Sequence, residues 1–263
     1  MKSARETRLI ALLFLAYLRV SRTYPENSVE SNDLLMAWDM LHGNVLLHGW
    51  YLSDVSFITT ELPQYALLVW LFGLHTDTAH IAAAMTYTLV VIFSVLLARG
   101  RVPRREARLR MLLTAGLMFA PQLGVGVFVL LLSLGHIGTA VPLLLTWLVI
   151  DRCPPRPWLP VLVGLLLTWV LIADPLVLLV GVVPLVAVCA LRVSRDLARR
   201  QDTSVQAALR ARWYELSLAV AAIAAQGLAS LAGRLLQAYI HPLAYQLARS
   251  IGYDARIGNK FLR

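Results

Sequence analysis

Long apolar runs separated by short clusters of arginine dominate this chain, and the pattern leaves few folds open to it. Hydrophobic residues make up 59% of the 263 residues, and charged residues make up only 15%. Soluble domains are about half apolar and about a quarter charged. A soluble fold of this size has no way to bury so much apolar surface, so we expect lipid to be the solvent around the chain. Disorder is excluded by the same composition.

The lengths of the apolar runs predict an all-α, polytopic membrane protein with about seven spans, because a spanning helix needs roughly 20 mostly apolar residues. We treat residues 1–263 as a single transmembrane domain. The first run follows Lys2 and Arg5 and has no small-residue cleavage site after it, so we expect an uncleaved helix. The predicted spans are Thr7–Val20, Thr78–Ala98, Leu109–Leu134, His136–Ile150, Trp158–Ala173, Leu176–Leu191 and Trp213–Leu235.

The arginine clusters predict the orientation, because cytoplasmic loops retain Lys and Arg. They place residues 99–110, 151–157 and 192–212 in the cytoplasm, together with the N-terminus, in a multi-pass protein of the plasma membrane. Residues 21–63 carry one arginine among several acidic residues, so this long loop is predicted to be external. To preserve that orientation, we interpret the run Leu62–Leu74 as an interfacial or re-entrant helix. The positive net charge therefore reflects membrane anchoring, and no nucleic-acid partner is expected.

The external loop is the expected functional region, because a membrane protein has few other places to assemble polar groups. A surface helix is predicted from Asp33 to about His42. Ser31 or Asn32 is expected to cap its start, and Gly43 to end it in a left-handed conformation.

This loop resembles the first external loop of the C-type glycosyltransferase superfamily (GT-C), in which an acidic residue follows the first span and short helices precede the second. The residues that carry the resemblance are Asp33, Ala37, Met40, Leu41, Gly43 and Asn44. Two later stretches, Gly135 to Thr139 and Ala173 to Leu176, are similar to actinobacterial relatives of that group. The resemblance covers about Arg5 to Arg195 as a pattern of spans. It departs in two ways: Leu34 stands where many members have a second acidic residue, and members are usually longer, which suggests a truncated, divergent or split member.

The resemblance implies an enzyme that transfers a sugar from a polyprenyl-phosphate carrier on the external face of the membrane. Glycosyl transfer to a hydroxyl group requires a carboxylate that accepts the proton, and Asp33 is our first candidate, with Asp39 and Asp54 as alternatives. A solvated acidic loop is the plainer interpretation of these three residues and of Glu61. The candidates for substrate binding are Arg22, His48, Glu61, His136 and Asp174.

His136 and Asp174 lie at predicted external ends of spans, so we expect them to share a cavity with the acidic loop. Asp174 is followed by Pro175 and is equally suited to capping the next helix. No metal-ligand spacing or phosphate-binding loop occurs, so no metal site is expected, and the cofactor is left open.

The expected partners are membrane lipids and the polyprenyl-linked sugar donor. Two other functions stay open: a non-catalytic protein or subunit that packs against a membrane-protein partner, and, less favoured, a transporter. A transporter would show ionisable residues within its spans or repeated broken helices.

Overall fold

The computed structural model describes residues 2–26, 28–50, 52, 55–120, 136–199 and 212–240, and all regular elements within these ranges are helices, as predicted. The π-helical turn η1 runs directly into α9. The elements are α1 (Lys2–Ser21), α2 (Ser28–Leu41), α3 (Glu61–Phe72), α4 (Asp77–Arg99), α5 (Arg104–Phe119), α7 (Ile137–Arg152), α8 (Leu159–Ala173), η1 (Leu178–Val182), α9 (Val183–Arg199) and α11 (Trp213–Ile240).

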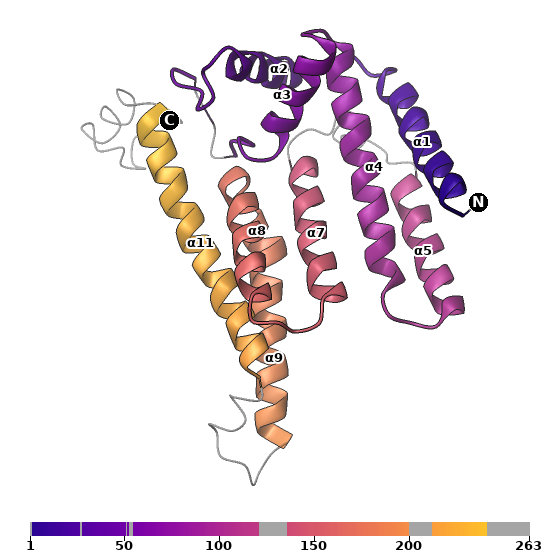
Figure 1. Ribbon diagram of the computed structural model, residues 1–263, viewed down its shortest axis with the longest axis vertical. Helices are drawn as coiled ribbons and strands as arrows, with labels where there is room; N and C mark the ends of the chain where they lie inside the picture. Colours follow the sequence, from indigo (N-terminus) through magenta and orange to yellow (C-terminus); the bar gives the residue numbers. More distant parts are fainter. Residues whose placement is uncertain are drawn as a thin grey trace, which may run out of the picture.

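The long helices stand side by side, and the short helices α2 and α3 lie across one end of them (Figure 1). Helix α4 packs against α1, α5 and α7, whereas α11 packs against α8 and α9. The arginine-containing connections from α4 to α5 and from α7 to α8 both lie at the opposite end (Figure 1). The acidic segment and the arginines therefore occupy opposite ends of the helix bundle, which the positive-inside pattern also requires.

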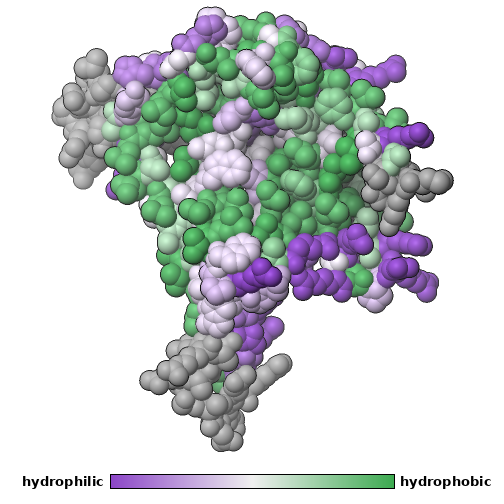
Figure 2. Space-filling model, in the orientation of Figure 1, coloured by the Kyte–Doolittle hydropathy of each residue, from purple (hydrophilic) through white to green (hydrophobic). Residues whose placement is uncertain are grey.

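Three helical segments are long and apolar enough to cross a membrane: Asp77–Arg99, Leu178–Ala198 and Trp213–Tyr239. Leu159–Ala173 is apolar but shorter. Large apolar side chains are exposed on the outer faces of these helices, among them Leu165, Leu179, Val220, Ile223 and Leu231. Figure 2 shows this apolar surface as a belt, with hydrophilic residues gathered above and below it. A patch of this extent is unusual on a soluble monomer and indicates a membrane protein.

The predicted spans all overlap observed helices, although the number that cross the membrane and the side that each end faces stay predictions. Helix α5 ends at Phe119, and the second half of the predicted span Leu109–Leu134 lies outside the described residues. A short helix, α3, is found where an interfacial helix was expected over Leu62–Leu74, and it lies across the bundle end beside α2 (Figure 1).

The predicted start of the surface helix was wrong, because α2 begins at Ser28 instead of Asp33. Glu30 lies in its first turn, where a negative charge interacts favourably with the positive end of the helix dipole. Asp33 therefore lies inside the helix and shares a face with Glu30, three residues earlier. The predicted end is confirmed: α2 stops at Leu41, and Gly43 has a φ of 103°.

Two of the three apolar cores among the described residues include buried residues of the long helices. One joins α2, α3 and α4 through Leu34, Ala37, Leu68 and Ala82, which are all buried. The other joins α7, α8, α9 and α11. In the second core, a Cβ atom added at Gly164 of α8 would lie 3.3 Å from the carbonyl oxygen of Ala221 on α11, so small residues allow close helix packing there. The first core holds α2 and α3 in place, and these helices carry Asp33 and Glu61.

Candidate functional site

The centre of the candidate site is the carboxyl group of Glu61, where the first turns of α3 and α7 meet. Glu61 is 6% exposed, and the hydroxyl of Thr60 donates a hydrogen bond to its Oε2 at 2.5 Å. Its Oε1 is buried and has no hydrogen-bond partner among the described residues. Across from it, a Cβ atom added at Gly138 would lie only 2.4 Å from the carboxyl carbon. The absence of a side chain at Gly138 is therefore what leaves room for Glu61.

Asp33 on α2 belongs to the same acidic cluster, and burial changes the titration of both groups. Burial, with a smaller contribution from the charge of Glu30, raises the pKa of Asp33 to about 7. Burial also raises the pKa of Glu61 to about 8, although the hydrogen bond from Thr60 and the nearby amide of Gly138 act in the opposite direction. The negative charge of Asp33 adds to this increase, so the two carboxyl groups lie within electrostatic reach.

Tyr65 lies one turn after Glu61 and is buried within the same cluster. Its pKa is raised well above the usual range, first by burial and then by the charges of Asp33, Glu30 and Glu61. The phenol therefore keeps its proton and can donate a hydrogen bond at any physiological pH.

A second pair, His136 and Asp174, lies at the neighbouring helix ends. His136 precedes α7 and is half exposed, whereas the side chain of Asp174, which follows α8, is 1% exposed. Nδ1 of His136 lies 2.5 Å from Oδ2 of Asp174, and the hydroxyl of Thr139 donates to the same oxygen at 3.0 Å. Oδ1 accepts the backbone N–H of Leu176 at 2.9 Å. Asp174 therefore caps the following turn, as the sequence predicted, and it also orients His136; its part in substrate binding stays a prediction.

The segment that precedes Glu61 links the two parts of the site. The amides of Ser56 and Phe57 donate to the carbonyl of Ala173 at 3.0 and 3.2 Å, directly before Asp174. The hydroxyl of Thr59 donates to the carbonyl of Trp169 at 2.7 Å. The ring of Phe57 meets that of His136 edge-on, with 6.3 Å between centroids. The structure thus brings Asp33 within electrostatic reach of Glu61, and it brings Glu61 into contact with the start of α7, which His136 precedes.

The other predicted residues lie elsewhere. Oδ2 of Asp39 accepts hydrogen bonds from Trp50 Nε1 at 2.7 Å and from Asn44 Nδ2 at 2.6 Å, and these bonds lower its pKa. Asp39 therefore holds the turn after α2 together. His48 is exposed in that turn, and its ring lies edge-on to Tyr239. Arg22 pairs through two hydrogen bonds, of 2.5 and 2.6 Å, with Asp77 at the start of α4.

The alternative catalytic residue Asp54 lies outside the described residues. Five residues of the site were missed from the sequence: Glu30, Tyr65, Gly138, Thr139 and Thr60. Helical spacing could have found the first two, since Glu30 precedes Asp33 by three residues and Tyr65 follows Glu61 by four. Gly138 and Thr139 lie in the stretch that resembles GT-C relatives, but no local pattern pairs them with Glu61 or Asp174.

We expect thermal stability to fall as the pH rises from about 5 to about 8, because the unfolded chain releases these carboxyl protons near pH 4.5 or below. The folded protein keeps the proton on Glu61 up to about pH 8, so it binds more protons than the unfolded chain across this window. The free energy of unfolding therefore falls as the pH rises through this window. Unfolding temperatures in detergent should show the slope, and Glu61→Gln should reduce it. Glu106→Gln, at an exposed position of α5, should leave the slope unchanged; an equal reduction there would contradict the assignment.

We expect Gly138→Ala to lower the free energy of unfolding by about 1–3 kcal/mol, because the new methyl group overlaps the buried Glu61 side chain. The cost should largely disappear in a Glu61→Ala background, and a double-mutant cycle measures that coupling. Gly116→Ala is the matched control, since nothing lies within 4 Å of a Cβ atom there. If the two changes affect the free energy of unfolding additively, Gly138 and Glu61 do not compete for the same space.

The fold and the site define an α-helical membrane protein with a buried carboxyl cluster and an oriented histidine at one end of its bundle. Among the described residues, no group of three or more His, Cys, Asp or Glu side chains is arranged to hold a metal ion. Comparisons with protein-family models, curated proteins and solved structures found no match, so the geometry must carry the functional argument.

Proposed function

We propose that this protein is a membrane glycosyltransferase of the C type, which transfers a sugar from a polyprenyl-phosphate donor and uses Asp33 as its catalytic carboxylate. The observation that carries the proposal is the contact of the Glu61 carboxyl group with the start of α7, where His136 is held by Asp174, with Asp33 of α2 within electrostatic reach of Glu61. The order of elements supports it, because a long helix, two short helices across the bundle end and a second long helix are what the GT-C resemblance implies.

The titration of the cluster suits general-base chemistry. In the transfer, the acceptor oxygen bonds to the anomeric carbon as the bond from that carbon to the phosphate oxygen breaks. The acceptor hydroxyl loses its proton to a base, and the lipid phosphate leaves as an anion. Asp33, with a pKa of about 7, is ionised in a large fraction of molecules at neutral pH and remains basic enough to take that proton. Glu61, with a pKa of about 8, stays mostly protonated and can donate a hydrogen bond to a sugar or phosphate oxygen.

In this proposal, the residue that contacts the leaving phosphate is His136. Its Nδ1 is engaged by the buried Asp174, which fixes the ring orientation and leaves Nε2 for a ligand. The ring is half exposed, so a substrate can reach it. Arg22, another of the predicted substrate-binding residues, is already paired with Asp77, and we assign it no role in donor binding.

The test is sugar transfer by the purified protein in lipid nanodiscs supplied with a panel of labelled polyprenyl-phosphate sugars. Release of polyprenyl phosphate and labelled product would be measured together. The proposal expects turnover of at least one donor, loss of turnover in Asp33→Asn, and normal turnover in Glu106→Gln, a charge-matched control at the opposite end of the bundle. A folded protein that neither binds nor consumes any donor in the panel would overturn the proposal in favour of a non-catalytic role.

A further inference from the structure

We propose that the arginine-rich end of the bundle contains a binding site for an anionic phospholipid, in a cavity between α4, α7, α9 and α11. The cavity has a volume of about 490 Å³. It lies at the end of the bundle opposite the carboxyl cluster, so the inference is independent of the proposed transferase activity. Side chains from all four helices and from the turn after α7 line it.

One wall of the cavity is apolar and suits an acyl chain. Leu97, Trp147, Leu185 and Val188 contribute to this wall. Val188 is 45% exposed, and Leu191 on the same helix is 53% exposed, so the wall continues onto the outer apolar surface of α9. A lipid tail can therefore run from the cavity along the membrane-facing side of α9. A soluble anion would gain nothing from that surface.

The charged residues that line the cavity are two arginines, Arg101 and Arg192, and two acidic residues, Asp151 and Glu215. Each acidic residue forms an ion pair with an arginine outside the lining, Asp151 with Arg152 at 3.1 Å and Glu215 with Arg212 at 2.8 Å. Arg212 also pairs with Asp196 at 2.6 Å, so four arginines meet three carboxylates at this site. Arg101, by contrast, donates to a neutral backbone carbonyl, that of Asp151. Its guanidinium charge is therefore not compensated there.

Two further donors face the same space. Arg192 lines the cavity and takes part in none of the ion pairs that the described residues form. Tyr214 also lines it, and its hydroxyl is buried without a hydrogen-bond partner among the described residues. A buried hydroxyl without a partner is costly, and a phosphate oxygen would supply the missing acceptor. Arg101, Arg192 and Tyr214 thus form a set of donors suited to a phosphate diester.

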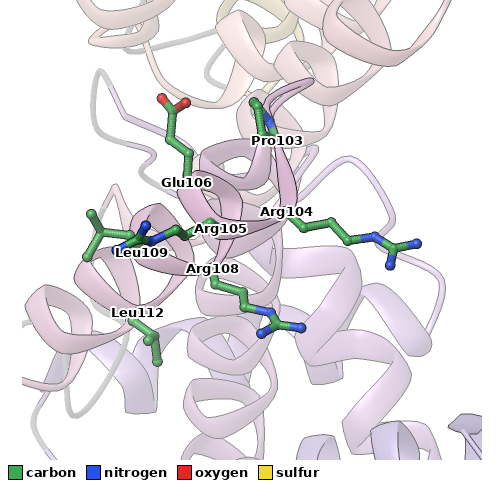
Figure 3. A pocket seen from close by; sticks show the side chains of 7 residues that line it. All are labelled: Pro103, Arg104, Arg105, Glu106, Arg108, Leu109 and Leu112. Atoms are coloured by element: carbon green, nitrogen blue, oxygen red, sulfur yellow. The ribbon is translucent and has the colours of Figure 1, made fainter.

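The adjacent start of α5 extends this positive surface. A surface hollow there is lined by Arg104, Arg105 and Arg108 with Glu106, and in Figure 3 Arg104 and Arg108 extend to the same side of the helix. All of its lining residues come from the single stretch Pro103 to Leu112, so this hollow adds charge but no enclosed site. Basic pockets between membrane helices, close to such charge, bind the head groups of anionic lipids.

The first test is lipid retention by the full-length protein in detergent, measured by native mass spectrometry with equal amounts of phosphatidylglycerol and phosphatidylcholine. We expect the wild type to retain phosphatidylglycerol in preference to phosphatidylcholine. Arg101→Gln and Arg192→Gln should each reduce this retention about fivefold, and the double variant should combine the two losses. The matched control is the double variant Arg156→Gln and Arg195→Gln, which removes the same charge from exposed positions at the same end outside the cavity lining. Equal retention by the two double variants would overturn the proposal.

A second readout uses the chain's own thiols, because Cys153 and Cys189 are its only cysteines and both line the cavity. Maleimide labelling should be slower in phosphatidylglycerol nanodiscs than in phosphatidylcholine nanodiscs, and the difference should vanish when both cavity arginines are replaced. Equal labelling rates in the two lipids would contradict the assignment. Protection by inorganic phosphate in lipid-free detergent, to the same extent as by phosphatidylglycerol, would show a site for a soluble anion and would refute the lipid as its ligand.

Discussion

Replacing Asp33 by Asn should lower the rate of sugar transfer by about 10²–10⁴-fold, the usual loss when a general base is removed. Asn keeps the size of the side chain but has no basic oxygen that can take the acceptor proton. The fold should survive, because burial already disfavours a charge at this position. Initial rates with the polyprenyl-phosphate donor would measure the loss, and the unfolding temperature would confirm that the variant is folded.

Asp39→Asn is the matched control for this prediction, since it makes the same chemical change on the same helix. Asp39 holds Trp50 and Asn44 in the turn after α2, so its replacement should loosen that turn and leave the transfer rate near that of the wild type. Loss of transfer in Asp39→Asn with normal transfer in Asp33→Asn would reassign the catalytic carboxylate. Normal transfer in both variants would remove α2 from the mechanism.

Replacing Asp174 by Ala should lower the free energy of unfolding by about 2–4 kcal/mol, because the change deprives several donors of one buried acceptor. The backbone N–H of Leu176 loses its bond to the carboxylate, and His136 loses the group that orients it, whereas the hydroxyl of Thr139 still has the carbonyl of His136 as an acceptor at 2.7 Å. Chemical denaturation in mixed micelles would measure the change. Sugar transfer by the folded fraction should also fall, since the His136 ring becomes free to rotate.

Asp174→Asn separates the structural role of this residue from its electrostatic role. Its amide oxygen can still accept the N–H of Leu176, so the stability loss should be clearly smaller than in the Ala variant. The negative charge beside His136 is gone in both variants, so both should transfer sugar slowly. Equal stability of the two variants would show that the hydrogen bond to Leu176 contributes nothing measurable.

The positions of the helices could be predicted from the sequence because they depend on local properties. Length and apolar composition indicated the long helices that were found from Asp77 to Arg99 and from Trp213 to Ile240. The end of α2 was equally local, since Gly43 adopts a positive φ at low steric cost. The start of α2 was missed because a cap was assigned at Ser31 or Asn32, whereas the helix begins at Ser28.

Local sequence could identify only some of the site residues. Asp33 and Asp39 look alike in the sequence, as acidic residues six positions apart on one helix, yet Asp33 is half-buried within electrostatic reach of Glu61, whereas Asp39 accepts hydrogen bonds from the turn after the helix. What distinguishes them is the neighbours supplied by distant parts of the chain. A pKa near neutrality requires such neighbours, because burial in low dielectric is what shifts it.

The sequence by itself determined that this chain is helical, that its surroundings are apolar and that its acidic and basic residues separate along the bundle, since these follow from composition and spacing. Only the tertiary structure decided that Glu61 faces Gly138 and that Asp174 orients His136, because residues 77 and 38 positions apart meet only through the way particular helices pack. Helix packing depends on the fit of whole surfaces, which no short stretch of sequence encodes.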